Sequence, residues 1–412
     1  MKNKLFSLGD IHVSDFVSDE DIKNNNLSDK EPLTLVMDPE LETPRLTSVP
    51  DADKMYGKYW YRSGINATMT NELREIAEDC VNAIPTKEGD VFMDIACNDG
   101  TMFKFIPNTF TKVGVDPCDD SYYKESSQLA DLVIQDYFTA ESYKKSKFGN
   151  RKAKIITTIA MFYDLDDPLS FLQDIDSVMD DEGLFVIQMS YTPLMLRQLA
   201  FDNICHEHVY YHTLKSMKKV LAQAGMTVVD CQLNDINGGS FRLYIRKNIA
   251  DPTNFRTSPA RDVARYRVES IEALEEKEKV SDPETYTAFY NRILSLKNET
   301  VNFIRLEKAK GKTIWGYGAS TKGNTLLQWF GLDSRDIDGI AERSPYKYGL
   351  KTVGTNIPIY SEDAMREAQP DYLLILPWHF IHEFKRRESA YLRKGGKFIV
   401  PCPSFEIIEH GS

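Results

Sequence analysis

Three of the seven histidines in this chain lie within residues 206–212, in a segment that also carries a carboxylate. An imidazole titrates near neutral pH, and an adjacent carboxylate can fix its tautomer and raise its basicity. His206, Glu207 and His208 are therefore candidates for a general base and its helper. Structural hydrogen bonding is one alternative, and a metal site is another. Zn²⁺ usually takes three or four ligands, however, and no partner cluster is visible, so we expect no metal.

A second set of polar residues follows two apolar runs that are typical of buried strands. The run Val91–Ile95 leads into a polar turn that ends at Gly100, and the run 112–116 ends in Asp116. A turn beneath the ligand and an acid after the next strand form the arrangement that holds a nucleoside. The pyrophosphate-binding pattern Gly-x-Gly-x-x-Gly is missing, which favours S-adenosylmethionine (SAM) over a dinucleotide. A purely structural turn is the alternative.

The predicted SAM pocket has three parts. The turn lies near the amino-acid moiety, an acid accepts the two ribose hydroxyls, and an acid followed by an aromatic ring grips adenine just past the third strand. An ordinary strand-end turn is the alternative for the last pair. The residues are Asp94, Ala96, Asn98, Asp99 and Gly100 in the turn, Asp116 at the ribose, and Asp136 and Tyr137 at adenine.

Two more glycine segments are candidates for substrate binding. The segment 316–324 reads as a strand, a glycine turn and a helix start, where free N–H groups and a lysine favour an anion. It is neither a Walker A loop nor a dinucleotide fingerprint, so a sugar-nucleotide diphosphate fits better; tight packing is the alternative. The two glycines of 237–239 allow close approach of a ligand or of another backbone, or form a plain β-turn. The candidates are Tyr317, Ser320, Thr321, Lys322, Asn324, Arg343 and Lys347, with Asn237, Gly238 and Gly239.

The surrounding pattern predicts an α/β fold with two Rossmann-like units. Alternating helix and strand patterns over 71–250 predict a mainly parallel SAM-binding sheet, whose last two strands, 226–231 and 240–246, are antiparallel. Residues 311–412 restart the pattern as a smaller substrate-binding unit. Residues 1–70 are read as a polar, irregular arm or lid, and 251–310 as a solvated helical linker.

Composition narrows the functional classes. The net charge is −12 and the sequence pI is about 5.2, which argues against a nucleic acid as the main partner. No run of about 18 apolar residues is present, and the first residues lack a signal-peptide core, so we expect a cytoplasmic protein without a membrane partner. The six cysteines are scattered, which is not the spacing of a disulfide framework or a zinc knuckle.

Taken together, the motifs resemble the sugar C-methyltransferases of deoxysugar biosynthesis, which methylate the C3 position of dTDP-4-keto-deoxyhexoses. The resemblance runs from about residue 34 to the C-terminus. It rests on the order and spacing of Tyr59-Trp-Tyr61-Arg-Ser-Gly64, Cys97-Asn-Asp-Gly100-Thr, His206-Glu-His208, Gly238-Gly-Ser-Phe-Arg242, Gly316-Tyr-Gly-Ala-Ser-Thr-Lys-Gly-Asn324 and Leu376-Pro-Trp378.

The resemblance implies a SAM domain and a C-terminal Rossmann-like domain with the sugar nucleotide between them. It also implies His208 as the base that removes the C3 proton, Glu207 beside it and Tyr61 near the substrate. The chain departs from the family where cysteine pairs of an N-terminal zinc domain are missing. Cys205 stands where the family usually has Tyr, Asn237 replaces a His, and Ala160-Met-Phe-Tyr163-Asp164 replaces an Asn-x-x-x-His segment. The cofactor is expected to be kept, while the sugar and the methylated atom are open. An O- or N-methyltransferase and a non-catalytic SAM-fold binding protein are the alternatives.

Overall fold

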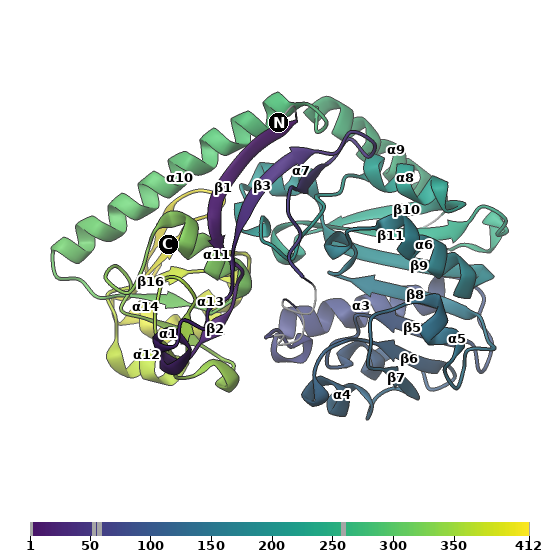
Figure 1. Cartoon of the computed structure of the whole chain (residues 1–412), viewed down its shortest axis with the longest axis horizontal. Coiled ribbons are helices and arrows are strands. Elements are labelled where there is room, and N and C mark those ends of the chain that lie inside the picture. Colours follow the sequence, from purple (N-terminus) through teal and green to yellow (C-terminus); the bar gives the residue numbers. More distant parts are fainter. Residues whose placement is uncertain (1–2, 52–54, 56–59, 257–260, 412) are drawn as a thin grey trace.

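A computed structural model describes residues 3–51, 55, 60–256 and 261–411. It contains two large sheets, flanked by helices, with a small N-terminal sheet at the seam between them (Figure 1). Tyr59 of the motif Tyr59-Trp-Tyr61-Arg-Ser-Gly64 lies outside the described residues. Among the residues described, no helix combines the length and the apolarity that a membrane span requires.

The first large sheet has seven strands in the order β10-β11-β9-β8-β5-β6-β7. All neighbouring pairs from β9 to β7 are parallel, whereas β11 is antiparallel to both β9 and β10, which confirms the predicted orientation of β10 and β11. The chain adds β6 and β7 on one side of β5 and then crosses to β8 on the other. The strands are β5 (Val91–Ile95), β6 (Thr111–Val115), β7 (Leu132–Ile134), β8 (Ala153–Ile159), β9 (Met179–Ser190), β10 (Met226–Asn234) and β11 (Ser240–Lys247).

Helices pack on this sheet through apolar faces and a buried ion pair. The side chain of Arg242 on β11 bonds Glu72 and Asp79 of the first helix, so charge as well as burial holds that helix in place. The side chain of Asn66 caps the same helix. The helices are α3 (Ala67–Ala83), α4 (Asp120–Ser126), α5 (Ala140–Lys144), α6 (Pro168–Val178), α7 (Thr192–Gln198), α8 (Leu214–Gln223) and α9 (Arg261–Glu278).

The second sheet has six strands in the order β15-β13-β12-β16-β17-β18 and is parallel except for β18. As in the first sheet, the chain builds one side of the central strand, β12, before it crosses to β16 on the other. The strands are β12 (Ile314–Tyr317), β13 (Gly339–Glu342), β15 (Ile359–Ser361), β16 (Tyr372–Ile375), β17 (Lys397–Val400) and β18 (Glu406–Ile408), and the helices are α11 (Thr321–Phe330), α12 (Glu362–Ala368), α13 (Ile381–Arg387) and α14 (Ser389–Arg393).

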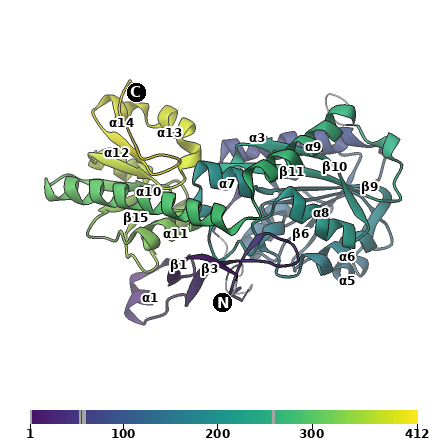
Figure 2. The same ribbon diagram turned by 90° about the horizontal axis from the view of Figure 1, so that it is seen from above.

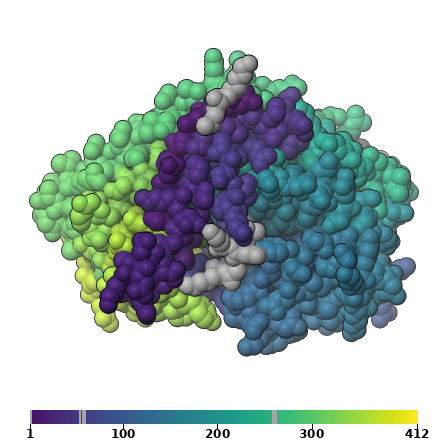
Figure 3. Space-filling model, in the orientation of Figure 1, coloured from purple at the N-terminus to yellow at the C-terminus, as the bar shows by residue number. Residues whose placement is uncertain are grey.

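The expectation of an irregular N-terminal arm is wrong. Strands β1 (Lys4–His12), β3 (Lys30–Met37) and β4 (Pro44–Leu46) form an antiparallel sheet, with the short helix α1 (Asp19–Lys23) between β1 and β3. Strand β2 (Phe16–Val17) pairs with β14 (Lys351–Thr352). Leu33 and Leu35 are fully buried, because the large units on either side supply the apolar partners that this segment lacks on its own. In the space-filling view the N-terminal residues lie across the boundary between those units (Figure 3).

The helices between the two units are also more than a solvated linker. Helix α10 (Pro283–Ala309) contacts β1 and buries Phe289, Ile293 and Ile304 in the core of the second unit (Figures 1 and 2). The prediction failed because the surface of α10 is dominated by charge, whereas one narrow apolar stripe is enough to bury a long helix against neighbours far away in sequence.

Candidate active site

The turn after β5 is built from backbone conformations that few side chains tolerate. Ala96, Asn98 and Gly100 all have positive φ angles, of 61°, 51° and 74°. At Gly100 a Cβ would lie 2.8 Å from the Cα of Ser126, so only glycine fits this close approach. The turn therefore lies directly against α4, at the carboxyl end of β5.

Asp116, at the end of β6, fastens this turn. Its Oδ2 accepts a hydrogen bond from the Asn98 N–H at 2.7 Å, and its Oδ1 accepts one from the Cys118 N–H at 2.9 Å. A carboxylate oxygen has more than one acceptor site, so these bonds leave capacity for the hydroxyls of a ribose. The predicted ribose acid thus also has a structural task that the sequence did not reveal.

Asp94, next to the end of β5, is buried. It accepts a hydrogen bond of 2.6 Å from the hydroxyl of Thr157. Burial raises the pKa of Asp94 to about 7, the Thr157 bond opposes this, and the charge of Asp116 adds to the rise. Two carboxyl groups so close together favour a cation between or beside them, which suits the positive sulfonium of SAM.

Residues 61–65 lie over the turn after β5, residues 96–100, which we call the donor turn because SAM is the predicted methyl donor there. The side chain of Asn98 accepts from the Ser63 N–H and donates to the Tyr61 carbonyl, while the carboxylate of Asp99 accepts from the Gly64 N–H at 2.8 Å. The side chains of Asn98 and Asp99 therefore hold this covering segment. The same bonds place Tyr61, which is 41% exposed, beside the predicted pocket.

Asp136 and Tyr137 lie just past β7, at the same edge of the sheet, and both are exposed. The Tyr137 N–H donates to the carboxylate of Asp136 at 2.8 Å, so this part is a tight strand-end turn. An aromatic face and an acid therefore stand where the predicted adenine would lie, and their role stays a prediction.

His208 has the geometry of a general base. It is buried, and its Nδ1 lies 2.7 Å from the carbonyl oxygen of Asn203. A carbonyl oxygen only accepts, so Nδ1 carries the proton and Nε2 keeps a free lone pair. Burial lowers the pKa of His208 to about 3, and the charge of Lys322 adds to this effect. The imidazole is therefore neutral, and able to accept a proton, at any physiological pH.

His206 and Glu207 were predicted to act with His208, but their side chains have other surroundings. Nε2 of His206 lies 3.1 Å from the Glu31 carbonyl, so this ring is tied to β3 of the N-terminal sheet. The predicted catalytic role of His206 is therefore corrected to a structural one. The tautomer of His208 is set by Asn203 and not by Glu207, because adjacent residues of a tight turn point in different directions. Oε2 of Glu207 is buried without a hydrogen-bond partner among the described residues.

The edges of both large sheets meet at the segment that carries this base. The order in which strands are added reverses beside β5 in one sheet and beside β12 in the other, and such switch points open a crevice at the carboxyl ends of the strands. After β8, the ring of Tyr163 lies 4.0 Å from the ring of His208. After β12, Lys322 bonds Asn203, and after β16, Nε1 of Trp378 donates to Asp202 at 3.2 Å. His208 is thus placed between the two switch points.

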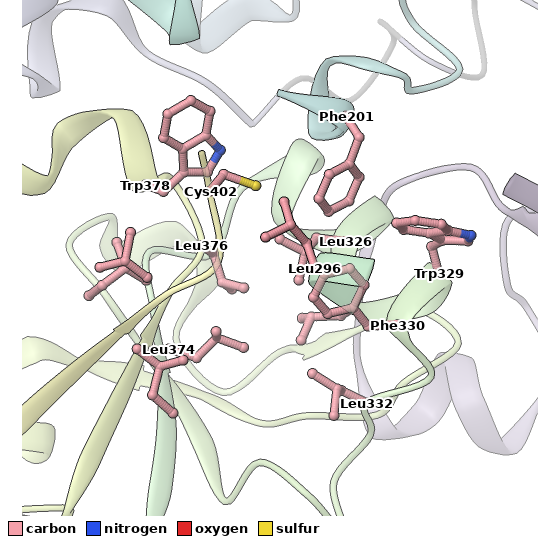
Figure 4. Packing of buried hydrophobic residues seen from close by; sticks show 14 of the residues in the cluster. Phe201, Leu296, Leu326, Trp329, Phe330, Leu332, Leu374, Leu376, Trp378 and Cys402 are labelled. Carbon is pink, nitrogen blue, oxygen red and sulfur yellow. The ribbon is translucent and has the colours of Figure 1, made fainter. Parts of the chain in front are cut away.

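Apolar packing fixes this junction. Phe201 stacks on Phe330 and lies against Trp329, both from α11, with ring centroids 5.4 and 4.9 Å away (Figure 4). Trp378 and Cys402 lie beside the same cluster, and the Cys402 thiol is 3.5 Å from the Leu199 carbonyl. Residues 201–203, although part of the first unit, are therefore held mainly by the second.

The second glycine turn is organised around Glu342. Its carboxylate accepts hydrogen bonds from the N–H groups of Ala319, Arg343 and Ser344 at 2.7–2.8 Å. Like Asp116, Glu342 thus fastens the turn beside it. The missing dinucleotide fingerprint, and not these bonds, argues against the ribose of a dinucleotide here.

Two of the predicted substrate residues are used inside their own unit. The hydroxyl of Tyr317 bonds Glu388 at 2.8 Å and Glu362 at 3.1 Å, and Nζ of Lys347 donates to the Ala319 carbonyl at 2.6 Å. Both side chains are buried. We therefore withdraw them as substrate contacts, because sequence spacing could not show which way a strand residue or a loop lysine points.

The other predicted residues of this turn face the junction. Ser320 caps α11 through the Gly323 N–H, and the Thr321 carbonyl accepts from Ser14. Asn324 donates to the Asp15 carbonyl, while its Oδ1 is buried without a partner among the described residues. Arg343 is exposed and donates to the Ile65 carbonyl at 2.9 Å, which connects the two units at the rim.

The glycines at 238 and 239 have a packing explanation. A Cβ on Gly238 would lie 3.3 Å from the Trp378 ring, and a Cβ on Gly239 would lie 2.5 Å from Cβ of Leu194. Side chains of the protein, rather than the predicted other backbone, make the close approach at both glycines. Asn237 has a positive φ of 54°, and its role toward a substrate stays a prediction.

Sequence reasoning gave no role to Asn203, Tyr163 or Trp378, although all three contact the base or its segment. The available signal was the pair Asp202-Asn203 in an otherwise apolar stretch, since buried polar side chains need partners. Within the described residues, no three His, Cys, Asp or Glu side chains gather to hold a metal ion.

Comparisons with known proteins identify methyltransferase domains in this chain. A family model described as "Methyltransferase domain" matches residues 66–230, and one described as "C-methyltransferase C-terminal domain" matches residues 235–403. The C-methyltransferase NovU of Streptomyces niveus is 28% identical over 364 residues, which are 88% of this chain and 84% of that protein.

Solved structures show a weaker likeness. The plantazolicin methyltransferase BpumL in complex with SAH is 11% identical, covers 45% of this chain and 88% of its own, and has a TM-score of 0.36. A SAM-dependent methyltransferase from Clostridium acetobutylicum is 15% identical, covers 43% of this chain and 92% of its own, and has a TM-score of 0.32. These scores are too low to support a conclusion.

The two family models follow one another in the order that the structure builds. The first covers β5 to β9 and the start of β10, with the turn after β5, and the second covers β11, α10, the strands β12 to β17 and Lys322 of α11. The two acids at the donor turn suit a sulfonium nucleoside, so the residues present fit the cofactor that the family uses. The chain is therefore a SAM-dependent methyltransferase and belongs to the sugar C-methyltransferase family.

Proposed function

We propose that this enzyme methylates a carbon next to a keto group in a nucleotide-linked deoxysugar, with His208 as the general base. The observation that carries the proposal is the state of His208. It is neutral, its Nδ1–H is held by the Asn203 carbonyl, and its Nε2 is free to accept a proton between the two switch points. A base must be unprotonated and within hydrogen-bond reach to take a proton from a carbon acid, and the carbonyl beside that carbon stabilises the charge that is left.

The residues would act in a single sequence. Nε2 of His208 takes the proton from the carbon beside the carbonyl, and the electron pair of that C–H bond moves into an enolate whose charge lies on oxygen. SAM supplies a methyl group on a positive sulfur, which leaves as a neutral thioether. The enolate carbon forms the new C–C bond with that methyl group, and His208 releases its proton to water. The enolate and the positive sulfur would lose their opposite charges in the same step, and a site that excludes water favours such a step.

On this proposal the two units divide the work. Residues 71–250 hold the donor through Asp94 and Asp116, and residues 311–412 hold the acceptor. The start of α11 offers N–H groups and a positive dipole end to a diphosphate, with Ser320, Thr321 and Asn324 beside it and Arg343 at the rim. Tyr61 and the segment 237–239 would border the sugar.

The test is methyl transfer from labelled SAM to a panel of dTDP- and UDP-linked 4-keto-6-deoxysugars, run in D₂O. We expect transfer to at least one sugar, with exchange or loss of a carbon-bound proton. His208→Asn should lower kcat by about 10³-fold or more and leave the Kd for SAM within about twofold, since general-base catalysis acts on the chemical step. Lys308→Met on α10 is a matched control, because it removes an ion pair with Asp338 at the amino end of β13, away from the carboxyl ends of the strands. It should keep the kcat and the SAM affinity of the wild type.

Two outcomes contradict the proposal. Methylation of oxygen or nitrogen without any change at carbon-bound hydrogen would make the enzyme an O- or N-methyltransferase. Full activity of His208→Asn would remove this residue from the mechanism.

A further inference from the structure

Lys322 points at the general base. It lies at the start of α11 in the second unit, yet its ammonium bonds Oδ1 of Asn203 in the first unit. Its charge also acts on His208, where it adds to the effect of burial and lowers the pKa of the imidazole. A lysine whose only task was to bind the diphosphate would not need to lie so close to the base.

Asn203 connects Lys322 with His208. Its main-chain carbonyl holds Nδ1 of His208 at 2.7 Å, and its side-chain carbonyl holds the Lys322 ammonium. The hydroxyl of Ser190 donates to the same Oδ1 at 3.3 Å. Nδ2 of Asn203 is buried without a partner among the described residues, as are Oδ1 of Asp202 and Oδ1 of Asn324. Buried polar atoms left unpaired around a lysine and a neutral histidine indicate space for a polar ligand group.

Cys205 supplies no strong hydrogen-bond donor for the carbonyl oxygen of the substrate. The family usually has a phenol there, whereas this chain has a buried thiol, and burial raises the pKa of that thiol well above its usual range. A thiol is a weak hydrogen-bond donor, and the Cys205 Sγ already faces the Asn203 carbonyl at 3.7 Å. The enolate oxygen therefore needs another donor, and an ammonium has three N–H groups to offer.

We propose that Lys322 donates a hydrogen bond to the substrate carbonyl oxygen next to the carbon that His208 deprotonates, and that Asn203 is the positioning residue that holds both side chains. The inference rests on the proposed function and specifies which end of the substrate Lys322 binds. The charge of Lys322 stabilises the oxygen as it becomes negative, while the proton goes to Nε2 of His208. The diphosphate is then left to the N–H groups of α11 and to Arg343.

The groups that face His208 come from three elements. Lys322 belongs to α11, Tyr163 follows β8, and Asn203 precedes His208 in its own segment. Of these, only Lys322 carries a charge. Removal of that charge should therefore raise the pKa of His208 whether or not a substrate is present, and this gives a readout that does not depend on the proposed function.

The first experiment is a pH titration of the free enzyme by NMR with ¹⁵N-labelled histidine, in which His208→Asn identifies the His208 signals. In the wild type we expect Nδ1-protonated, neutral His208 down to about pH 4. In Lys322→Met its pKa should rise by about one unit or more. In Asn203→Ala the loss of the tie to Lys322 should shift the same signals, while Lys308→Met should not. Unchanged His208 signals in both Lys322→Met and Asn203→Ala would overturn the proposal.

The second experiment separates the two ends of the substrate. Lys322→Met should lower kcat, and the rate of deuterium exchange at the acidic carbon with S-adenosylhomocysteine bound, by about 10²- to 10³-fold, as for the loss of one oxyanion donor. The Kd for plain dTDP or UDP should change less than about threefold, which calorimetry measures. Asn203→Ala should lower kcat by about tenfold, and Asn203→Asp, which keeps an acceptor for Lys322, should recover most of that loss.

The outcomes are distinguishable. A tenfold or larger loss of dTDP or UDP affinity in Lys322→Met, with kcat at saturating substrate unchanged, would place Lys322 on the diphosphate and overturn the inference alone. Wild-type enzyme that methylates none of the keto sugars would overturn the proposed function and the carbonyl role together. The NMR titration would then still show whether Lys322 and Asn203 act on His208.

Discussion

The turns after β5 and β12 are built in the same way but carry opposite charge. In each, a strand leads into a glycine-containing turn, and an acid at the end of the neighbouring parallel strand accepts the N–H groups of that turn. Asp116 does this for Asn98, and Glu342 does it for Ala319. The backbone device is therefore shared, and it does not by itself choose a ligand.

The side chains around each turn make the choice. The first turn has buried Asp94 beside Asp116, with no cation bonded to either carboxylate among the contacts that the structure gives for described residues. The second has Lys322 at the start of α11, and its carboxylate, Glu342, already accepts three N–H groups. The first therefore suits a cation and the second an anion. One construction serves both halves of a group-transfer site.

The largest expected effect comes from Asp116→Ala. It leaves the N–H groups of Asn98 and Cys118 without their acceptor, which should lower the free energy of unfolding by about 2–3 kcal/mol. It also removes the acceptor of the ribose hydroxyls, so the Kd for SAM should rise by about 30-fold or more. Denaturant unfolding and calorimetry measure the two effects. Unchanged SAM affinity would mean that the ribose does not lie on Asp116.

Glu342→Gln is the matching change at the second turn. One oxygen becomes an NH₂ group that cannot accept, so the free energy of unfolding should fall by about 1–3 kcal/mol. The affinity for SAM should stay within about twofold of the wild type, because no donor contact is made there. If calorimetry showed the same loss of SAM affinity as in Asp116→Ala, the two turns would not be independent.

Asp94 should give SAM binding a pH dependence. Its pKa is about 7 in the folded protein, whereas an unburied Asp has a pKa of 3.8. The folded state therefore binds this proton more tightly than the unfolded state. The stability gained from the protonated form is complete below pH 3.8 and is lost as pH rises through 7. A cationic donor prefers ionised Asp94, so its affinity should rise by about tenfold from pH 6 to pH 8.

Asp94→Asn is the control for this dependence. We expect the slopes of both stability and SAM affinity to flatten across the same pH range, measured by thermal unfolding and calorimetry. An equally steep rise of SAM affinity in Asp94→Asn would assign the titration to another group.

The smallest effect is expected at the helix that follows the second turn. Ser320→Ala removes the cap on the Gly323 N–H and should cost about 1 kcal/mol of stability. Thr213→Ala, which removes a capping box next to the base segment, should cost about the same. Thermal unfolding measures both. A clearly larger loss in Ser320→Ala would show that this cap also supports the contact between Lys322 and Asn203.

Much of the fold was predictable because parallel strands that are buried on both faces form continuous apolar runs. The expected strand 91–95 coincides with β5, and the expected run 112–116 is shifted by one residue from β6. The N-terminal sheet was missed because Leu33 and Leu35 are too few to predict a core on their own. The buried face of α10 was missed for a similar reason.

At the site, residue types were easier to predict than directions. The motif His206-Glu-His208 indicates acid–base chemistry, but only the fold shows that His206 bonds the N-terminal sheet while His208 faces the junction. Tyr317 and Lys347 were expected at the substrate, yet both bond within their own unit. Asn203 received no role because its partners, His208 and Lys322, lie 5 and 119 residues away.

The sequence by itself determined the two Rossmann-like units, the nucleoside-binding turn with its acids, and a histidine able to act as a base. These follow from local periodicity, from glycine at positions of positive φ and from the chemistry of single side chains. Only the tertiary structure decided which histidine lies at the junction of the two units, which carbonyl fixes its tautomer and which lysine reaches its segment. Those choices depend on contacts between segments far apart in the chain, and local pattern carries no information about them.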